Sequence, residues 1–255
     1  MSMHDNSSVL PVTRNASRIT HYASRVTRHA SRLIRHASRF TIIFLLSILL
    51  LNSSCNESAK FHKEADELYI KGKYKEALEL YDRALEINSK DGEVWFDKGE
   101  SLFGLDRYEE AVACYDRALE LKPEEGRIWY GKGEALRRKG KYYEAITCYD
   151  KAVEIDPLAG SAWYGRGEAL NSLGNYEEAI KSCDKAIEIN YRNFDAWYCK
   201  ATASDKLGNY RESVRCYDRA LEIKPDDLNS WYGKGQALNN LGDYENSIIC
   251  YDRAI

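Results

Sequence analysis

The sequence predicts an all-α protein whose main part is a solenoid of antiparallel helix pairs, and three observations support this prediction. The five tryptophans of the chain stand 34 residues apart, at Trp95, Trp129, Trp163, Trp197 and Trp231. Nearly the same phrase surrounds several of them, as in "WYGKGEAL" at 129–136 and "WYGRGEAL" at 163–170. Apolar and small residues recur around them at the three- and four-residue steps of a helix face. A fixed period of this length is typical of proteins in which each repeat stacks on the next.

Numbering each repeat so that the aromatic residue falls at position 4 divides the solenoid, residues 58–255, into six units. Their bounds are 58–91, 92–125, 126–159, 160–193, 194–227 and 228–255, and the last unit is incomplete. Position 8 is glycine or alanine, position 17 is always tyrosine, and position 27 is always alanine. Position 24 is tyrosine in every repeat except the fourth, which has Cys183.

Each repeat contains the signals of two helices in order. Positions 4, 8 and 11 share one face of a first helix, and positions 17, 20, 24, 27 and 28 share one face of a second. The turn between them contains glycine, as in "RKGKY" at 138–142, where Gly140 can take a positive φ. Proline at position 32 stops the second helix in three repeats, at Pro123, Pro157 and Pro225. Small residues at positions 8, 20 and 27 allow close helix packing, and the large rings fill the remaining space.

These columns resemble the tetratricopeptide repeat (TPR) family, whose unit is a 34-residue helix–turn–helix. The resemblance covers residues 58 to 255 and implies a right-handed superhelical solenoid. One column departs from the family pattern. The family often has leucine at position 7, whereas this chain has Glu64 in the first repeat and lysine or arginine in the others. A long basic stem can still cover apolar surface while its charged head reaches water.

The resemblance also implies a concave groove, because in this family one face of the first helix binds extended peptides or partner helices. Mapped by position, the groove contains an aromatic row at position 5 and polar residues at positions 9 and 12. The predicted groove residues are Phe96, Tyr130, Tyr164, Tyr198, Tyr232, Glu100, Glu134, Glu168, Gln236, Phe103, Arg137, Asn171, Asp205 and Asn239.

Two interpretations of the aromatic row stay open. The rings are suitable anchors for a partner, or they rest against the neighbouring helix. Some TPR domains clamp the carboxylates of a chaperone tail with lysines and asparagines, but this chain has mostly aromatic residues, glycine and glutamate at those positions. The acidic row at position 9 favours a partner that carries basic or hydroxyl groups.

Charge and motifs exclude several function classes. The 198 residues of the repeats carry 30 basic and 38 acidic residues, whereas a nucleic-acid binder needs a basic stripe. The sequence has no Gly-rich phosphate loop, no G-x-S-x-G and no H-E-x-x-H motif, and its seven cysteines form no C-x-x-C pair. Four of these cysteines recur at position 23 and are interpreted as small packing residues: Cys114, Cys148, Cys216 and Cys250. We expect no enzymatic activity, cofactor, metal, nucleic acid or small-molecule substrate.

The first 39 residues differ in kind from the repeats. "TRNASRI", "THYASRV", "TRHASRL" and "IRHASRF" repeat every seven residues between Thr13 and Phe40. As a helix this arm would have a narrow apolar stripe flanked by arginine, as a membrane-surface segment does. Its Ser, Thr and Asn content and the lack of acids to pair with the arginines favour disorder instead.

Residues 40–57 form a hydrophobic segment that predicts export or membrane attachment. Its apolar core of about 12 residues is short for a membrane span and suits a signal peptide. Cys55 stands where a bacterial-type lipoprotein signal has its lipidated cysteine, although Asn52 occupies a place that is usually aliphatic. The alternative is an uncleaved anchor with the arginines on the inside. We expect the solenoid to be membrane-associated and extracytoplasmic, with a cytoplasmic location as the alternative.

Together these features predict a non-enzymatic scaffold, tethered to a membrane, that binds a protein or peptide in its concave groove. A second interpretation is the regulatory TPR portion of a larger transferase or kinase truncated at residue 255. A third is an envelope assembly factor that binds lipoprotein or polymer-export machinery.

Overall fold

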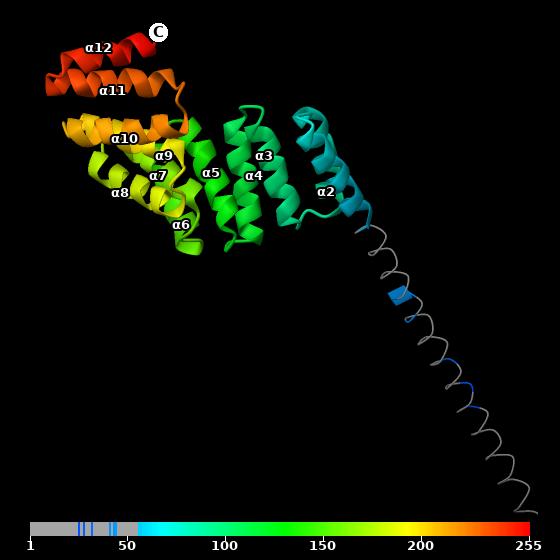
Figure 1. The fold of residues 1–255 in the computed structure, drawn as a ribbon. Helices are drawn as coiled ribbons and strands as arrows, with labels where there is room; N and C mark the ends of the chain where they lie inside the picture. Colours follow the sequence, from blue (N-terminus) through cyan, green and yellow to red (C-terminus); the bar gives the residue numbers. More distant parts are fainter. Residues whose placement is uncertain (1–24, 26–27, 29–31, 33–40, 42, 45–55) are drawn as a thin grey trace, which may run out of the picture. The chain divides into compact units, whose positions relative to one another are not determined.

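The structure is a computed structural model that describes residues 56–255 and six isolated residues before them, at 25, 28, 32, 41, 43 and 44. The chain divides into two units, residues 1–57 and 58–255. The described part contains helices and no strand, as predicted. A first helix includes residues 56–70, and eleven more follow (Figure 1). These are α2 (Tyr74–Ile87), α3 (Gly92–Phe103), α4 (Tyr108–Leu121), α5 (Gly126–Arg138), α6 (Tyr142–Ile155), α7 (Gly160–Leu173), α8 (Tyr176–Ile189), α9 (Phe194–Lys206), α10 (Tyr210–Ile223), α11 (Leu228–Leu241) and α12 (Tyr244–Arg253).

The predictions for the N-terminal segment concern residues that lie largely outside the described part. Cys55 and nearly all of residues 1–39 and 40–54 belong to this undescribed part. The six isolated residues there have helical backbone, and those in the basic arm are all arginines. Among the residues that the structure describes, none of the helices has the length and apolar character that crossing a membrane requires. The disordered arm, the signal or anchor segment and the lipidation of Cys55 therefore stay predictions.

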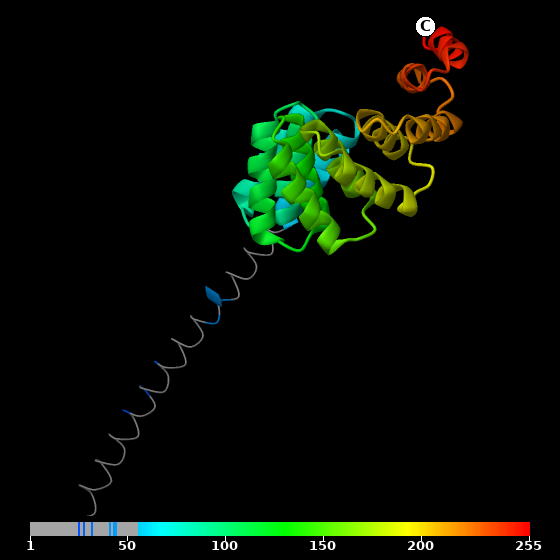
Figure 2. The same ribbon diagram turned by 90° about the vertical axis from the view of Figure 1, so that its left-hand side faces the viewer.

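The helices form a stack of repeats, each made of one odd-numbered and one even-numbered helix. Consecutive helices pack against each other from α2 to α12, and short turns join the two helices of a pair, which makes them antiparallel. Figure 2 shows the same stack turned by 90°, with the pairs following one another from the cyan helices to the red α12. Every even-numbered helix begins at the tyrosine of position 17, a position that the sequence assigns to the second helix.

The odd-numbered helices form the inner layer of the solenoid. Each of α3, α5, α7 and α9 contacts the next odd-numbered helix in addition to its neighbours in sequence. No even-numbered helix contacts the next even-numbered helix within the described chain. The stack therefore curves toward the side of the odd-numbered helices.

Glycine makes the turn from the first to the second helix of most repeats. Gly140 has a φ of 77°, and Gly174, which follows α7 directly, has a φ of 81°. The second repeat has Asp106 near this place instead, with a φ of 58°. Aspartate tolerates this left-handed region better than most residues. The prediction of a positive φ at Gly140 is confirmed.

The tryptophans join successive repeats at their loops and are only partly buried. The indole Nε1–H of Trp163 donates to the carbonyl of Pro157 at 3.0 Å, and Trp231 donates to Pro225 at 2.7 Å. The same bond, to the carbonyl of position 32 in the preceding repeat, recurs at Trp95, Trp129 and Trp197. Trp95, Trp129, Trp163 and Trp197 pack against the core clusters as predicted, but part of each ring stays exposed because the indole N–H reaches a backbone acceptor at the surface.

The rings at the centre of the core are the tyrosines of position 24. Tyr149 is fully buried, and its ring lies between two glycines of the repeated phrase. A Cβ atom added to Gly133, in the same repeat, would lie 2.8 Å from the ring, and one added to Gly165, in the next repeat, would lie 2.7 Å from it. Tyr115 has the same relation to Gly99 and Gly131. Both glycines of the phrase therefore make room for tyrosine rings, one within the repeat and one across repeats.

Candidate functional site

The structure brings the predicted aromatic row together on the inner layer of helices. Phe96, Tyr130, Tyr164, Tyr198 and Tyr232 lie on α3, α5, α7, α9 and α11. The first four are half-buried, and Tyr232 is exposed. All except Tyr164 pack against the position-24 tyrosine of their own repeat, with ring centroids 5.6–6.2 Å apart. Each of these rings thus rests on the neighbouring helix and keeps part of its surface accessible.

The position-9 carboxylates accept hydrogen bonds from the buried tyrosines of the core. The Tyr115 hydroxyl donates to Glu100, and the Tyr149 hydroxyl donates to Glu134, both at 2.5 Å. Burial raises the pKa of Glu100, although the hydrogen bond from Tyr115 acts in the opposite direction. The sequence predicted contact with a partner for these acids and missed this internal role. A buried hydroxyl needs an acceptor, which is the signal that could have revealed it.

Arg137 connects the third and fourth repeats across the inner layer. Its guanidinium donates to Glu134 and to Glu168, each at 2.8 Å. Asn171, another predicted residue of position 12, donates to the backbone carbonyl of Cys199 at 3.1 Å. These predicted polar residues of the middle repeats therefore make contacts between helices, and Arg137, Glu134 and Glu168 form one network. Two carboxylates share one guanidinium in this network, which leaves it with a net negative charge.

A second polar cluster lies in the first two repeats, where the sequence predicted no site. The His62 Nε2 atom is 2.7 Å from Asp97 and 3.5 Å from Asp66. Asp66 also accepts from the hydroxyl of Tyr81 at 2.8 Å. The hydrogen bond to Asp97 raises the pKa of His62, against the effect of burial. Two departures from the repeat pattern could have revealed this cluster. Position 5 is aromatic in the middle repeats but is His62 in the first, and position 6 is small in the middle repeats but is Asp97 in the second.

Among the described residues, this cluster is the group whose side chains could hold a metal ion. One ligand atom from each of His62, Asp66 and Asp97 lies within 4.8 Å of the others. Nitrogen and carboxylate ligands of this kind suit zinc and related cations. A protonated imidazole neutralises one of the two carboxylate charges, and the Tyr81 hydroxyl donates to Asp66, so the arrangement requires no metal.

The basic residues of position 7 pair with the aspartates of the repeated "YDRA" phrase. Lys132 Nζ lies 2.6 Å from Asp116, and Lys234 Nζ lies 2.7 Å from Asp218, in each case one repeat back. The same pair recurs at Lys98–Asp82, Arg166–Asp150 and Lys200–Asp184. The ammonium groups of Lys98, Lys132, Lys200 and Lys234 also lie over the tryptophan of their own repeat. The "YDRA" aspartates are therefore ion-pair partners between repeats and not only solvated charges.

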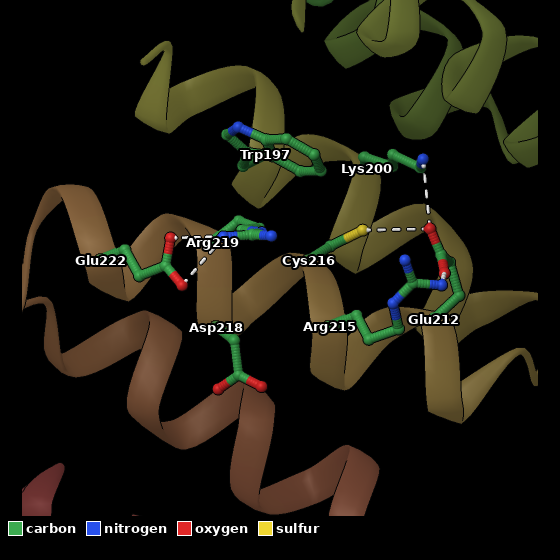
Figure 3. Close-up of a pocket in the computed structure, with 8 residues that line it drawn as sticks. All are labelled: Trp197, Lys200, Glu212, Arg215, Cys216, Asp218, Arg219 and Glu222. Atoms are coloured by element: carbon green, nitrogen blue, oxygen red, sulfur yellow. Dashed lines mark hydrogen bonds and ion pairs between the residues drawn. The ribbon is translucent and has the colours of Figure 1, made fainter. Parts of the chain in front are cut away.

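A charged hollow lies between α9 and α10 and holds about 340 Å³ (Figure 3). Lys200 and Arg215 both approach Glu212, at 3.2 and 3.0 Å, and the Cys216 thiol lies 3.7 Å from the same carboxylate. Burial raises the pKa of the Cys216 thiol to about 12. The charged groups that line the hollow are already paired, and the Cys216 thiol is protonated at neutral pH. The hollow therefore contains no activated nucleophile.

The other position-23 cysteines behave in the same way. Cys114, Cys148 and Cys250 are buried and free, as the sequence predicted. Burial raises the pKa of the Cys114 and Cys148 thiols to about 11. These side chains act as small packing residues of the even-numbered helices.

Comparison with known proteins identifies a family and a fold. Models of the tetratricopeptide repeat match residues 62–125, 96–159, 130–193, 194–227 and 216–248. The chain is 17% identical to MamA from Desulfovibrio magneticus. The match covers 64% of this chain and 92% of MamA, with a TM-score of 0.61. No curated protein matches the chain significantly.

Two further solved structures share the fold. YrrB, described as a TPR protein with an unusual peptide-binding site, is 24% identical, with 69% of this chain and 90% of YrrB covered and a TM-score of 0.60. PilW, described as a widely conserved type IV pilus biogenesis factor, is 18% identical, with 76% and 90% covered and a TM-score of 0.68. At these identities the likeness concerns the fold.

Proposed function

Because the chain belongs to the tetratricopeptide repeat family, we propose that it is a non-enzymatic scaffold that binds an extended peptide or a partner helix on its odd-numbered helices. The observation that carries this proposal is the aromatic row of position 5. Five rings recur once per repeat on the inner layer, and each keeps accessible surface after packing against its neighbour. Aromatic side chains in a row are effective anchors because they offer a large contact area with few rotatable bonds.

The polar residues beside the row favour a partner that carries hydrogen-bond donors. Glu168 is the least buried acid of the central network, and its carboxylate already accepts from Arg137 at 2.8 Å. The 38 acids and 30 bases of the repeats give the solenoid an acidic balance. A peptide with basic or hydroxyl side chains would complement this surface, whereas an acidic chaperone tail would be repelled. Among proteins with the same fold, YrrB is described as having a peptide-binding site, although an unusual one.

The binding test uses the full chain and a random peptide library, so that no partner has to be known beforehand. Enriched peptides are synthesised and titrated against the wild type and a variant with Tyr130, Tyr164 and Tyr198 changed to alanine. We expect the affinity to fall by at least tenfold, because three anchors are removed. Circular dichroism and thermal unfolding report whether the variant retains its helices.

The matched control changes two exposed tyrosines that lie away from the row. Tyr143 on α6 is 73% exposed and Tyr191 in the loop before α9 is 54% exposed. Their change to alanine should leave peptide affinity within twofold of the wild type. Unchanged affinity in the triple variant, or an equal loss in the control, would reject the groove.

We further propose that residues 40–57 attach the solenoid to a membrane, with Cys55 as the lipidated residue. The short apolar run, the preceding arginines and the position of the cysteine support this proposal. The intact mass of the protein from membrane and soluble fractions tests it. A species that begins at a lipid-modified Cys55 is the expected result. A soluble species that retains residues 1–54 would instead support a cytoplasmic scaffold.

A further inference from the structure

Two departures from the repeat pattern meet at the interface between the fourth and fifth repeats. Position 24 is tyrosine in the other five repeats and Cys183 in the fourth. Position 6, which is glycine in three repeats, is Cys199 in the fifth. In the second, third and fifth repeats the tyrosine ring occupies the space above the glycine of the next repeat, as Tyr149 does above Gly165. Where the ring is missing, a second thiol fills its place.

The two thiols lie unusually close together. Cys183 Sγ and Cys199 Sγ are 2.7 Å apart, and both side chains are buried. A disulfide bond is roughly 2.05 Å long, whereas unbonded carbon atoms pack at about 3.5–4.0 Å and sulfur is larger than carbon. The distance between these sulfur atoms is therefore closer to a bond than to a packing contact.

The surroundings hold both sulfur atoms in this position. A Cβ atom added to Gly167 would lie 2.7 Å from Cys183 Sγ and 3.3 Å from Cys199 Sγ, so the glycine of position 8 makes room for the pair. The Asn171 side-chain amide donates to Cys199 Sγ at 3.3 Å and to the Cys199 carbonyl at 3.1 Å. The thiols belong to α8 and α9, which pack directly against each other. Forming a bond therefore requires only a small movement of two side chains.

We propose that Cys183 and Cys199 form a disulfide bond that joins the fourth and fifth repeats when the chain meets a thiol–disulfide oxidant. The thiolate of one cysteine attacks a sulfur of the oxidant disulfide, and one oxidant thiol leaves. The second cysteine, after losing its proton, attacks the resulting mixed disulfide, and the second oxidant thiol leaves. Two thiols of the protein are oxidised, one disulfide of the oxidant is reduced, and the two protons end on the released thiols.

The bond would replace the missing tyrosine as the link across this interface. At three other interfaces one tyrosine ring fills the space between two repeats, but here two small side chains do so. A covalent bond between α8 and α9 would fix the spacing of α7 and α9, which carry Tyr164 and Tyr198. The proposal does not depend on what the aromatic row binds, because it concerns only the two thiols and the helices that carry them.

The experiment treats the full chain with oxidised glutathione, once in the native state and once during refolding from urea. The protein is then unfolded, its free thiols are alkylated, and intact mass and peptide mapping count and locate the unmodified cysteines. We expect two fewer alkylated thiols than in the reduced protein and a linked pair of peptides that contain Cys183 and Cys199. A pair formed in either arm supports the proposal. Complete alkylation in both arms, or a link that involves other cysteines, overturns it.

Three variants complete the test. Cys183→Ser and Cys199→Ser should lose the linked peptides and the two protected thiols. Cys148→Ser removes a buried thiol of position 23 and should leave the pair intact. Oxidation should raise the urea midpoint of the wild type and of Cys148→Ser by the same amount and leave that of Cys183→Ser unchanged. A rise in Cys183→Ser equal to that of the wild type would assign the stabilisation to another bond.

Discussion

At the scale of single residues, Tyr149 connects the core of the solenoid to its candidate binding face. Its ring is fully buried between Gly133 and Gly165, while its hydroxyl donates to Glu134. Glu134 in turn accepts from Arg137, which also pairs with Glu168. The carboxylates of this face are therefore held in place by hydrogen bonds from Tyr149 and Arg137. A partner would meet a surface whose polar groups are already oriented, which lowers the entropic cost of binding.

The hydroxyl of Tyr149 should contribute measurably to stability. Tyr149→Phe keeps the ring and removes the donor to Glu134, which leaves a largely buried carboxylate with one hydrogen bond fewer. We expect the free energy of unfolding to fall by about 1–2 kcal/mol, as for hydrogen bonds to charged groups. Urea unfolding measures this change. Tyr143→Phe on the exposed face of α6 is the control and should change it by less than about 0.5 kcal/mol.

The His62 cluster should make stability depend on pH in a defined direction. The hydrogen bond to Asp97 raises the pKa of His62 in the folded state above its ordinary value of 6.5. The protonated imidazole therefore stabilises the folded chain, fully below the pKa of the unfolded state and no longer once the pH passes the pKa of the folded state.

The measurement compares wild type with His62→Phe, which restores the aromatic residue of position 5. The difference in free energy of unfolding should shrink from about pH 6 to about pH 9, by about 1 kcal/mol or less for a partly exposed pair. The free energy of unfolding of Asp97→Asn should also lack this pH dependence, because the substitution removes the partner that raises the pKa of His62. A difference that stays constant over this range would show that the cluster does not depend on the charge of His62.

At the scale of helices, the sequence predicted the elements and the structure added the links between them. The two helices of each repeat and the positive φ of Gly140 followed from the repeated columns. The partial exposure of the tryptophans could not be predicted in this way. Hydrophobic periodicity shows that an indole lies on the packed face of a helix, but it does not locate the acceptor of the indole N–H. The pairing of Lys132 with Asp116 was missed for a similar reason, since both residues alone look like solvated charges.

The tryptophan bonds should stabilise the loops between repeats. Trp163→Phe keeps an aromatic ring and removes the bond from Nε1 to the Pro157 carbonyl. We expect a loss of about 1 kcal/mol from the hydrogen bond alone. Hydrogen exchange should become faster at the amides of residues 158–162, which follow that carbonyl, while exchange in α3 and α4 stays the same. Unchanged exchange in the loop would contradict this role.

At the scale of the whole molecule, each repeat depends on its neighbours on both sides. The odd-numbered helices contact one another along the inner layer, and the position-24 side chains Tyr115, Tyr149 and Tyr217 fill space between two repeats. In such a solenoid the stability is the sum of the repeats and of the interfaces between neighbours. The sequence predicted the stack from its period. It did not reveal the polar network of the candidate face, because Glu168 meets Arg137 only when the third and fourth repeats stack.

The same substitution should therefore cost more inside the stack than in its last helix pair. An added Cβ would lie 2.8 Å from the tyrosine ring both at Gly133, beside Tyr149, and at Gly235, beside Tyr251. Tyr149 is also confined by Gly165 of the next repeat, whereas α12, which carries Tyr251, contacts only α11 among the described helices. The ring of Tyr251 can move away, but that of Tyr149 cannot.

We expect Gly133→Ala to lower the free energy of the main unfolding transition by about 1–3 kcal/mol through overpacking. Gly235→Ala should lower it by less than about 1 kcal/mol and should speed hydrogen exchange mainly in α11 and α12, because the strain stays in a pair that opens locally. Alanine favours a helix by about 1 kcal/mol over glycine at both places, so this gain cancels in the comparison. Urea unfolding with hydrogen exchange measures both effects. Equal shifts in the main transition would mean that the solenoid unfolds as one unit and that the position of a repeat does not matter.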